Sequence, residues 1–352
     1  MSHIYPIRLR SSLHETIWGG RRLERDNWKT LPLDDSLIGE SWETEVSNVV
    51  LNGAYEGKNL AEVVAEAGTS FLGEQAVAIF GQRFPLLAKF IDANAQLSVQ
   101  VHPDDRYAAE FEGGKLGKTE FWYILSAEPG ATIVHGFKAP TDPNAVRKAI
   151  EEVQLEDLMH AEPVEAGDIV LVPAGTVHAI GSGIMLYELQ EYSDVTYRMY
   201  DYGRLTAAGT PRELHIERSL DVSHYTSSQQ IKTRPVSLAT TPDYEERCLV
   251  ACPYFLTREL RLKGGVKEGK TEGSCIILTS LGAEISIAYG EQLAHSETLS
   301  RGQTLVLPAS LGSIVLKERV HCSSHMYPQP MIQPGKPGRP RIPRVLFRAL
   351  FP

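Results

Sequence analysis

Residues 96–120 read QLSVQVHPDDRYAAEFEGGKLGKTE, and the fold prediction starts from this stretch. Apolar and polar residues alternate from 97 to 102, which predicts a strand with one apolar and one polar face. Gln100 and His102 are two positions apart, so both side chains should project from the polar face. Glu120 opens a second apolar run, which we expect to form a strand that returns beside the first.

These three polar residues form a candidate metal site. A glutamine, a histidine and a glutamate that converge inside a β-structure offer mixed nitrogen and oxygen ligands. Ligands of this kind suit zinc or a similar divalent ion. The sequence therefore predicts that Gln100, His102 and Glu120 bind one metal ion.

A fourth candidate ligand follows in residues 167–178, GDIVLVPAGTVH. Residues 169–172 predict a strand, the Pro-Ala-Gly turn breaks it, and His178 comes just beyond. The spacing of the glycines, the proline and the histidine is the second half of the pattern seen in cupins, which are small double-sheet barrels. The first half of that pattern, HxHx(3,4)E, has its counterparts in Gln100, His102 and Glu120, with the glutamate displaced by a long loop.

Composition limits the classes of function. The chain has 352 residues, 42% hydrophobic and 22% charged, which is enough for a sizeable core and two domains. A formal net charge of −9 argues against a general nucleic-acid binder. No apolar run is long enough to cross a bilayer, and the first residues lack the apolar core of a secretory signal. The four cysteines form no CxxC pair, so we expect reduced thiols in a cytoplasmic protein.

The organisation of the chain is predicted from its segments. Residues 1–232 should form the catalytic cupin domain, a mainly β unit with helical segments. Residues 233–326 should form a smaller β-barrel domain. Residues 327–352 are rich in proline and basic residues and contain no acid, which predicts a disordered or artefactual tail.

An internal repeat supports the second domain. Residues 302–309, GQTLVLPA, match the spacing of residues 167–174, GDIVLVPA. Ser313 occupies the position that corresponds to His178. We therefore expect the second barrel to be free of metal.

Two helices are also predicted from local sequence patterns. Apolar residues recur at helical spacing from Leu60 to Ala67. Asp142 is placed to cap a helix that has Pro143 at its first position. We expect the latter helix to be an insertion between strands, away from the site.

Six ordered motifs carry a family resemblance: TIWGG, GESWE, QLSVQVHPDD, GKTEFWYIL, VPAGTVHAI and YELQEYSDVTYRMYDYGR. With them the chain resembles the type I mannose-6-phosphate isomerases (phosphomannose isomerases) in their short bacterial form, over roughly residues 10–320. The resemblance implies a zinc-dependent, reversible conversion of mannose 6-phosphate to fructose 6-phosphate, with one Zn²⁺ per chain. It also implies a sugar phosphate as the partner, and no nucleic acid or membrane. The oligomeric state is expected to be a monomer or a weak homo-oligomer.

The resemblance assigns roles to individual residues. The family's metal ligands fall on His102, Glu120 and His178, with Gln100 as an extra ligand. The other assignments are a catalytic arginine at Arg198, an active-site glutamate at Glu188, and pocket lysines at Lys118 and Lys89. Arg204 stands where some relatives have a phosphate-contacting lysine, a replacement that keeps the charge.

The reaction sets its own requirements. Moving a carbonyl between C1 and C2 of a sugar removes a weakly acidic proton and passes through an enediol with negative charge on oxygen. Zinc with an open position would stabilise that charge, and Arg198 would do so from another side. Either Lys118 or Glu188 could move the proton, and the sequence leaves both open. With no glycine-rich phosphate loop present, Arg204 and the lysines are the candidate phosphate clamp.

Two other functions fit parts of the pattern. Two histidines and a carboxylate also hold Fe(II) in oxygenases, although Gln100 and the cations suited to phosphate argue against that class. A non-catalytic sensor of sugar phosphates on a cupin scaffold is the other alternative. The presence of Arg198 and Lys118 weakens it.

Overall fold

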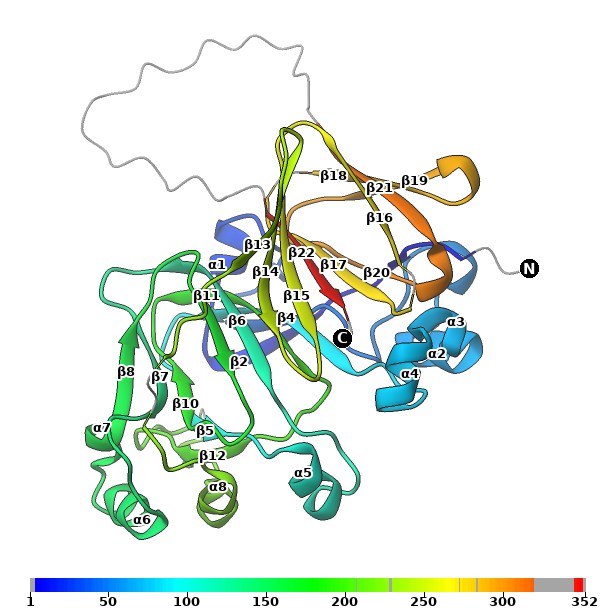
Figure 1. Cartoon of the computed structure of the whole chain (residues 1–352). Coiled ribbons are helices and arrows are strands. Elements are labelled where there is room, and N and C mark those ends of the chain that lie inside the picture. The colour runs from blue at the N-terminus through cyan, green and yellow to red at the C-terminus, as the bar shows by residue number, and fades with distance from the viewer. Residues whose placement is uncertain are drawn as a thin grey trace, which may run out of the picture.

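The computed structural model describes residues 4–206, 208–227, 230–271, 273–282, 284–319 and 345–350. It is mainly β, as the sequence predicts, and its strands form two pairs of sheets (Figure 1). The first pair has a six-stranded sheet in the order β2 (Ser12–Gly20), β3 (Ile38–Trp42), β4 (Leu86–Ala93), β11 (Ile184–Glu191), β6 (Glu120–Ala127), β9 (Ile169–Val172). Its five-stranded partner runs β12 (Tyr197–Tyr200), β5 (Val99–Val101), β10 (His178–Ile180), β7 (Thr132–Phe137), β8 (Met159–Pro163).

The two sheets of the first pair enclose an apolar core. Ile91 and Trp122 from the six-stranded sheet belong to the same buried cluster as Ile133 and Ile180 from the five-stranded sheet. Burial of such side chains stabilises the fold by about 1.5–3 kcal/mol each. Trp122 of this cluster also donates a hydrogen bond to Glu188, so the polar residues of the candidate site adjoin the apolar cluster.

Strand β5 lies between β10 and β12, and its register sets the site. Gln100 pairs with His178 on one side and with Arg198 on the other. The prediction that the strand of Glu120 returns beside that of Gln100 is wrong, because β5 and β6 belong to different sheets. Between them lies helix α5 (Asp105–Phe111), capped by the Asp104 side chain, which accepts a hydrogen bond from the Tyr107 N–H. This connection carries the chain across to the opposite sheet.

Strand β11 is buried on both faces and separates two environments. Its residues alternate, so Tyr187 and Leu189 point away from Glu188. Tyr187 and Leu189 join the core shared with the second pair of sheets, where the Tyr187 hydroxyl lies 3.1 Å from the Thr279 hydroxyl. Glu188 faces the candidate site. One strand therefore serves the site and the junction with the second sheet pair.

The second pair of sheets contains the first and the last of the described strands. Its seven-stranded sheet runs β1 (Ile7–Arg8), β20 (Thr304–Leu307), β17 (Ile276–Ser280), β22 (Val345–Leu350), β15 (Leu256–Leu262), β14 (Tyr244–Ala251), β13 (Val236–Thr240). The four-stranded sheet runs β16 (Val266–Lys270), β21 (Ser313–Glu318), β18 (Ile285–Tyr289), β19 (His295–Leu299). β1 belongs to this sheet pair although its residues lie within the predicted first domain, residues 1–232. The division of the chain at residue 232 stays a prediction.

The prediction of a disordered tail at 327–352 is wrong for residues 345–350. These residues form β22, which pairs with β15 on one side and with β17 on the other. The proline-rich composition that suggested disorder belongs to the preceding segment, whereas 345–350 read VLFRAL, which suits a strand. Residues 327–344 and 351–352 lie outside the described residues.

The internal repeat has a structural counterpart. β9 and β20 occupy its strand positions and are followed by Pro173 and Pro308. His178 is the first residue of β10, and Ser313 is the first residue of β21. The same strand–turn–strand unit therefore occurs in both sheet pairs, with a potential metal ligand in the first and a serine in the second.

The helices lie at the periphery (Figure 1). Near the second sheet pair are α2 (Leu60–Ala67), α3 (Thr69–Leu72) and α4 (Glu74–Phe80), and at the far end of the first are α6 (Pro143–Glu151), α7 (Leu155–Leu158) and α8 (Ile216–Val222). The short α1 (Arg22–Arg25) follows β2. The predicted cap is confirmed, since the Asp142 side chain accepts hydrogen bonds from the N–H groups of Asn144 and Ala145. Within the described residues, no helix has the length and hydropathy needed to cross a membrane.

Candidate active site

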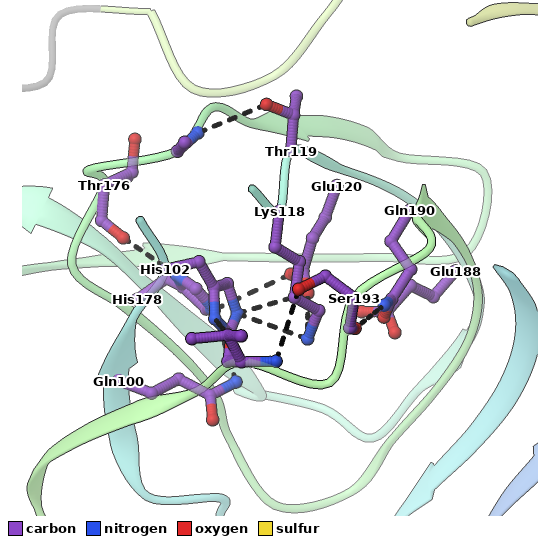
Figure 2. A network of polar contacts seen from close by, with 12 residues as sticks. Gln100, His102, Lys118, Thr119, Glu120, Thr176, His178, Glu188, Gln190 and Ser193 are labelled. Carbon is purple, nitrogen blue, oxygen red and sulfur yellow. Dashed lines mark hydrogen bonds and ion pairs between the residues drawn. The ribbon is translucent and has the colours of Figure 1, made fainter. Parts of the chain in front are cut away.

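Three predicted metal ligands converge at one end of the first sheet pair. His102 follows the last residue of β5, Glu120 begins β6 and His178 begins β10, and all three side chains are buried. Their potential ligand atoms lie within 4.8 Å of one another (Figure 2). The prediction that residues far apart in the sequence meet here is confirmed.

The two imidazoles are oriented by their second nitrogens. Nδ1 of His102 lies 2.9 Å from the Val195 carbonyl oxygen, and Nδ1 of His178 lies 2.8 Å from that of Thr176. A carbonyl only accepts, so each Nδ1 carries the proton and each Nε2 keeps a free lone pair. These Nε2 atoms face Glu120, at 3.2 Å from Oε1 for His102 and 3.6 Å from Oε2 for His178.

Burial keeps both imidazoles neutral. It lowers the pKa of His178 to about 3, and it lowers the pKa of His102, where the Lys118 ammonium adds to the effect. Burial opposes ionisation of Glu120, yet the charge of the Lys118 ammonium holds its pKa well below the usual value. Two neutral imidazoles and one carboxylate form a ligand set that suits a divalent cation.

Gln100 extends this set. Its side-chain nitrogen lies 3.3 Å from Nε2 of His178, on the same face of the sheet as His102. Rotation of the amide by half a turn exchanges this nitrogen for the oxygen, which is a metal-binding atom. All four predicted ligands are thus neighbours.

Glu120 provides a test of whether a cation fits. Its carboxylate is 1% exposed, and neither oxygen accepts a hydrogen bond of good geometry within the described part of the chain. Its charge is met by Lys118, whose Nζ lies 2.8 Å from Oε1 and 3.4 Å from Nε2 of His102. Buried carboxylate oxygens without hydrogen bonds are ligands that a divalent ion would satisfy. The residues present therefore fit a metal ion.

A second group of charges lies beside the first. Lys89 is buried, and its Nζ lies 3.2 Å from Glu40 and 3.5 Å from Glu188, over the Trp42 ring at 4.4 Å from its centroid. Burial disfavours the ammonium, but the two carboxylates outweigh it and raise the pKa of Lys89. Lys89 and Lys118 are therefore buried charged residues of the site and not solvated surface lysines.

Glu188 has an unusual protonation equilibrium. Its Oε1 accepts a hydrogen bond from Nε1 of Trp122 at 2.9 Å, and its side chain is 3% exposed. Burial and the nearby Glu120 charge raise its pKa to about 7, against the opposing effect of Lys89. A carboxylate that titrates near neutrality can both take and return a proton at physiological pH.

A cavity of about 780 Å³ is bordered by several of these groups, and the three buried candidate ligands contact its lining residues Gln100 and Lys118. Its polar and charged lining consists chiefly of Thr16, Glu40, Lys89, Ser98, Gln100, Lys118, Glu188, Asp194, Arg198 and Arg212. Trp18 and Trp42, from the TIWGG and GESWE motifs, form part of its apolar wall. This volume is in the usual range for a small-molecule site.

The predicted arginines differ in position. Arg198 lines the cavity, its Nη1 donates to the Glu213 carbonyl at 2.9 Å, and its Nε is buried without a hydrogen-bond partner among the described residues. Arg204 is not part of the cavity lining, because its guanidinium binds the Asp201 carboxylate and the Gln96 carbonyl. Arg212 lines the cavity instead and holds Asp201 through Nε at 2.8 Å and Nη2 at 2.6 Å.

The sequence reasoning missed three site residues. Glu40 and Trp42 belong to the GESWE motif, to which only the family resemblance was attached, and β3 is brought to the cavity by its pairing with β4. The signal that would have found them is the glutamate–tryptophan pair within GESWE itself. Arg212 follows a turn after β12, and apart from its charge no motif or spacing in the sequence indicates that it belongs to the site.

Comparisons with known proteins agree with this site. Residues 7–120 match the family model described as phosphomannose isomerase type I, catalytic domain. The mannose-6-phosphate isomerase of Streptococcus mutans is 39% identical over 313 residues, which is 88% of this chain and 94% of that protein. The chain belongs to the type I phosphomannose isomerase family. Another member, mannose-6-phosphate isomerase ManA of Bacillus subtilis, is 36% identical over 325 residues, covering 90% of this chain and 97% of that protein.

Solved structures of type I phosphomannose isomerases show the same architecture. The crystal structure of the mannose 6-phosphate isomerase from Bacillus subtilis aligns with a TM-score of 0.82 at 29% identity, over 99% of both chains. A phosphomannose isomerase mutant from Salmonella typhimurium aligns with a TM-score of 0.73 at 14% identity, which shows the shared fold alone. The alignment with the Bacillus subtilis structure thus extends over nearly the whole of both chains.

Proposed function

We propose that this chain interconverts mannose 6-phosphate and fructose 6-phosphate. The observation that carries the proposal is the buried cluster of His102, Glu120 and His178. Its neighbours Gln100 and Lys118 line a cavity together with Arg198 and Glu188. Family membership supports the same substrate pair. Removing a proton next to a carbonyl needs a base, and the resulting enediol needs positive charge near its oxygens.

The metal at this cluster is proposed to be zinc, one ion per chain, held by His102, Glu120 and His178 with Gln100 as an additional ligand. The two unprotonated Nε2 atoms that face Glu120 support this assignment, as do the Glu120 oxygens, which accept no hydrogen bond of good geometry from a described residue. Bound there, zinc would supply a Lewis acid for negative charge on the substrate oxygens.

Glu188 is proposed to move the proton between C2 and C1. It borders the cavity, Trp122 fixes its carboxylate, and its pKa of about 7 suits proton transfer in both directions of a reversible reaction. Lys118, the other candidate, pairs with Glu120 and is proposed to orient that carboxylate. Lys89 is proposed to balance the charges of Glu40 and Glu188.

Arg198 is proposed to stabilise the enediol oxygen. Its backbone pairs with Gln100, and its guanidinium faces the cavity with an unpartnered Nε among the described residues. A fixed cation close to a developing negative charge lowers the barrier most when water is excluded.

Arg212 is proposed as the clamp for the substrate phosphate, in place of Arg204. Only Arg212 of the two lines the cavity, and its bidentate contact with Asp201 holds the guanidinium in place. Arg204 is proposed to support it, since both arginines bind the same carboxylate.

The deciding experiment is an assay of fructose 6-phosphate formation from mannose 6-phosphate, coupled to a reporter enzyme, with metal content measured on the same sample. We expect about one zinc per chain, loss of turnover with a chelator and recovery with added zinc. Activity under nitrogen should be unchanged, whereas a dependence on oxygen would favour the oxygenase alternative. Binding of mannose 6-phosphate without turnover by zinc-loaded protein would favour the sensor.

We also propose an architecture, a cellular location and an oligomeric state for the chain. The first sheet pair is proposed to be a cupin barrel and the second a smaller metal-free barrel, on the strength of the repeated strand–turn–strand unit. The chain is proposed to be cytoplasmic, and a monomer or weak homo-oligomer. The cytoplasmic location is supported by three free thiols, Cys248, Cys252 and Cys275.

A further inference from the structure

A second polar hollow, of about 460 Å³, lies where the N-terminal segment meets the turn before β20. Four cations line it, Arg8, Arg10, Lys29 and Arg301, against a single carboxylate, Glu43. This excess of positive charge stands out in a chain whose formal net charge is −9. We call this hollow the arginine pocket.

Arg301 is the least satisfied of these cations. Its guanidinium stacks on Trp28, 3.9 Å from the ring centroid, and its Nε and one Nη are buried without a hydrogen-bond partner among the described residues. No described carboxylate lies within ion-pair distance of it. The Asp26 charge acts on Arg301 from farther away, and Asp26 itself pairs with Arg25. A partly desolvated guanidinium without a counterion is costly, and an anion nearby would offset that cost.

Arg10 is a second cation without a counterion. Its side chain is exposed and forms no ion pair or hydrogen bond with a described residue. The other two cations are paired: Arg8 with Glu297, and Lys29 with Glu43 at 2.7 Å. Even if each of these pairs is counted as neutral, Arg10 and Arg301 leave two positive charges at the pocket.

The walls of the pocket are held in place from several sides. β1 pairs with β20, which aligns Arg8 with Leu305, and Lys29 donates a hydrogen bond of 2.6 Å to the Gly302 carbonyl. Gly302 has a positive φ of 75°, and a Cβ there would lie 2.2 Å from the Trp28 carbonyl oxygen. Segments 8–10, 27–30 and 301–304 therefore meet in a fixed arrangement and not in a loose surface cluster.

We propose that the arginine pocket is a binding site for a small organic phosphate, separate from the candidate active site. Arginine presents a planar set of donors that matches the phosphate oxygens, and two uncompensated arginines suit a doubly charged group. The volume fits a small ligand. The pocket and the active-site cavity share no lining residue within the described part of the chain.

The test is calorimetric titration of the full-length, zinc-loaded protein with inorganic phosphate. Loss of one charge-assisted contact corresponds to about 1.5–3 kcal/mol, or roughly a 10- to 150-fold weaker affinity. We expect Arg301→Gln and Arg10→Gln each to weaken binding by at least tenfold, and the double variant to abolish it. Arg147→Gln, which removes an exposed arginine from α6, should leave the affinity unchanged and serves as the charge-matched control.

A further variant separates the two cavities. Arg212→Gln alters the active-site cavity, so phosphate binding at the arginine pocket should survive in it. If wild type binds two phosphates, the double variant should retain one of them. The proposal is overturned if wild type binds no phosphate, or if binding is lost in Arg212→Gln and retained in the double variant. Should Arg301→Gln fail to fold, the exposed Arg10→Gln decides, and unchanged affinity in it overturns the proposal.

Discussion

Glu188 on β11 lies directly opposite Lys89 on β4, with 3.5 Å between the carboxylate Oε2 and the ammonium Nζ. The Glu188 pKa nevertheless stays raised, at about 7, because burial and the Glu120 charge outweigh the attraction of Lys89. A charged pair on neighbouring strands thus leaves one partner able to exchange a proton near neutral pH.

Glu188→Gln should reduce kcat by about 10²–10⁴-fold, the usual contribution of a general base. Since Glu188 is ionised above its pKa, wild-type kcat should fall as the pH drops through about 7, and the variant should lose this acid limb. The glutamine keeps an acceptor for Trp122, so the fold should be retained. A pH–rate profile with coupled detection measures both effects. A variant with near-normal turnover, alongside an inactive Lys118→Met, would assign proton transfer to Lys118.

His178→Ala and Arg198→Ala should separate metal binding from transition-state stabilisation. His178 is a proposed zinc ligand, so its variant should lose zinc and turnover together. Arg198 contacts no member of the cluster by hydrogen bond or ion pair among the described residues, so its variant should keep zinc and lose turnover by about 10²–10³-fold. Metal analysis and kinetics on the same preparations decide the matter. Equal loss of zinc in both variants would contradict the role given to Arg198.

Arg212→Gln and Arg204→Gln should differ in their effect on substrate binding. Loss of a charge-assisted phosphate contact corresponds to about 1.5–3 kcal/mol, so Arg212→Gln should raise KM for mannose 6-phosphate by roughly 10- to 150-fold. Arg204→Gln should have a smaller effect, because Arg204 acts on Asp201 and not on the cavity. Steady-state kinetics of the two variants test this. A larger rise of KM in Arg204→Gln would restore the assignment made from the sequence.

Glu191→Gln should change stability in a pH-dependent way. Burial, with the Asp105 charge, raises the Glu191 pKa from 4.5 to about 8. Because the folded-state pKa is raised, this group's contribution to stability is fully present below about pH 4.5 and is lost as the pH rises through about 8. Glutamine does not titrate, so the variant should gain stability relative to wild type between pH 5 and 8.5, by on the order of 3–5 kcal/mol.

Urea unfolding at several pH values measures this difference. Glu217→Gln is the matched control, because Glu217 is exposed and its pKa is lowered by Arg147, so it stays ionised over the whole range. A stability difference between Glu191→Gln and wild type that does not change with pH would show that Glu191 is ionised in the folded protein at pH 5.

Much of the site could be predicted from the sequence because its signals are local. Alternation in β5 places Gln100 and His102 on one face, and the turn before His178 has a characteristic spacing. The cap at Asp142 is equally local. Periodicity states which face of a strand a residue occupies, but not which sheet the strand joins. For that reason β6 was expected beside β5, whereas it lies in the opposite sheet.

The features that the sequence did not reveal depend on long-range pairing. Glu40 reaches Lys89 only because β3 pairs with β4. Arg212 reaches the cavity because Asp201 holds it, a contact that no spacing rule predicts. β22 was hidden behind a proline-rich segment whose composition indicates disorder, although its own residues suit a strand.

The pairing of β1 with β20 has a consequence for biosynthesis. Ile7 can pair with Val306 only after residue 306 has left the ribosome, and β22 inserts between two strands made earlier. The seven-stranded sheet can therefore close only after residues 345–350 have been synthesised. Until then the first residues and the outer face of the neighbouring sheet remain without their final cover, which is the interval when chaperones would matter most.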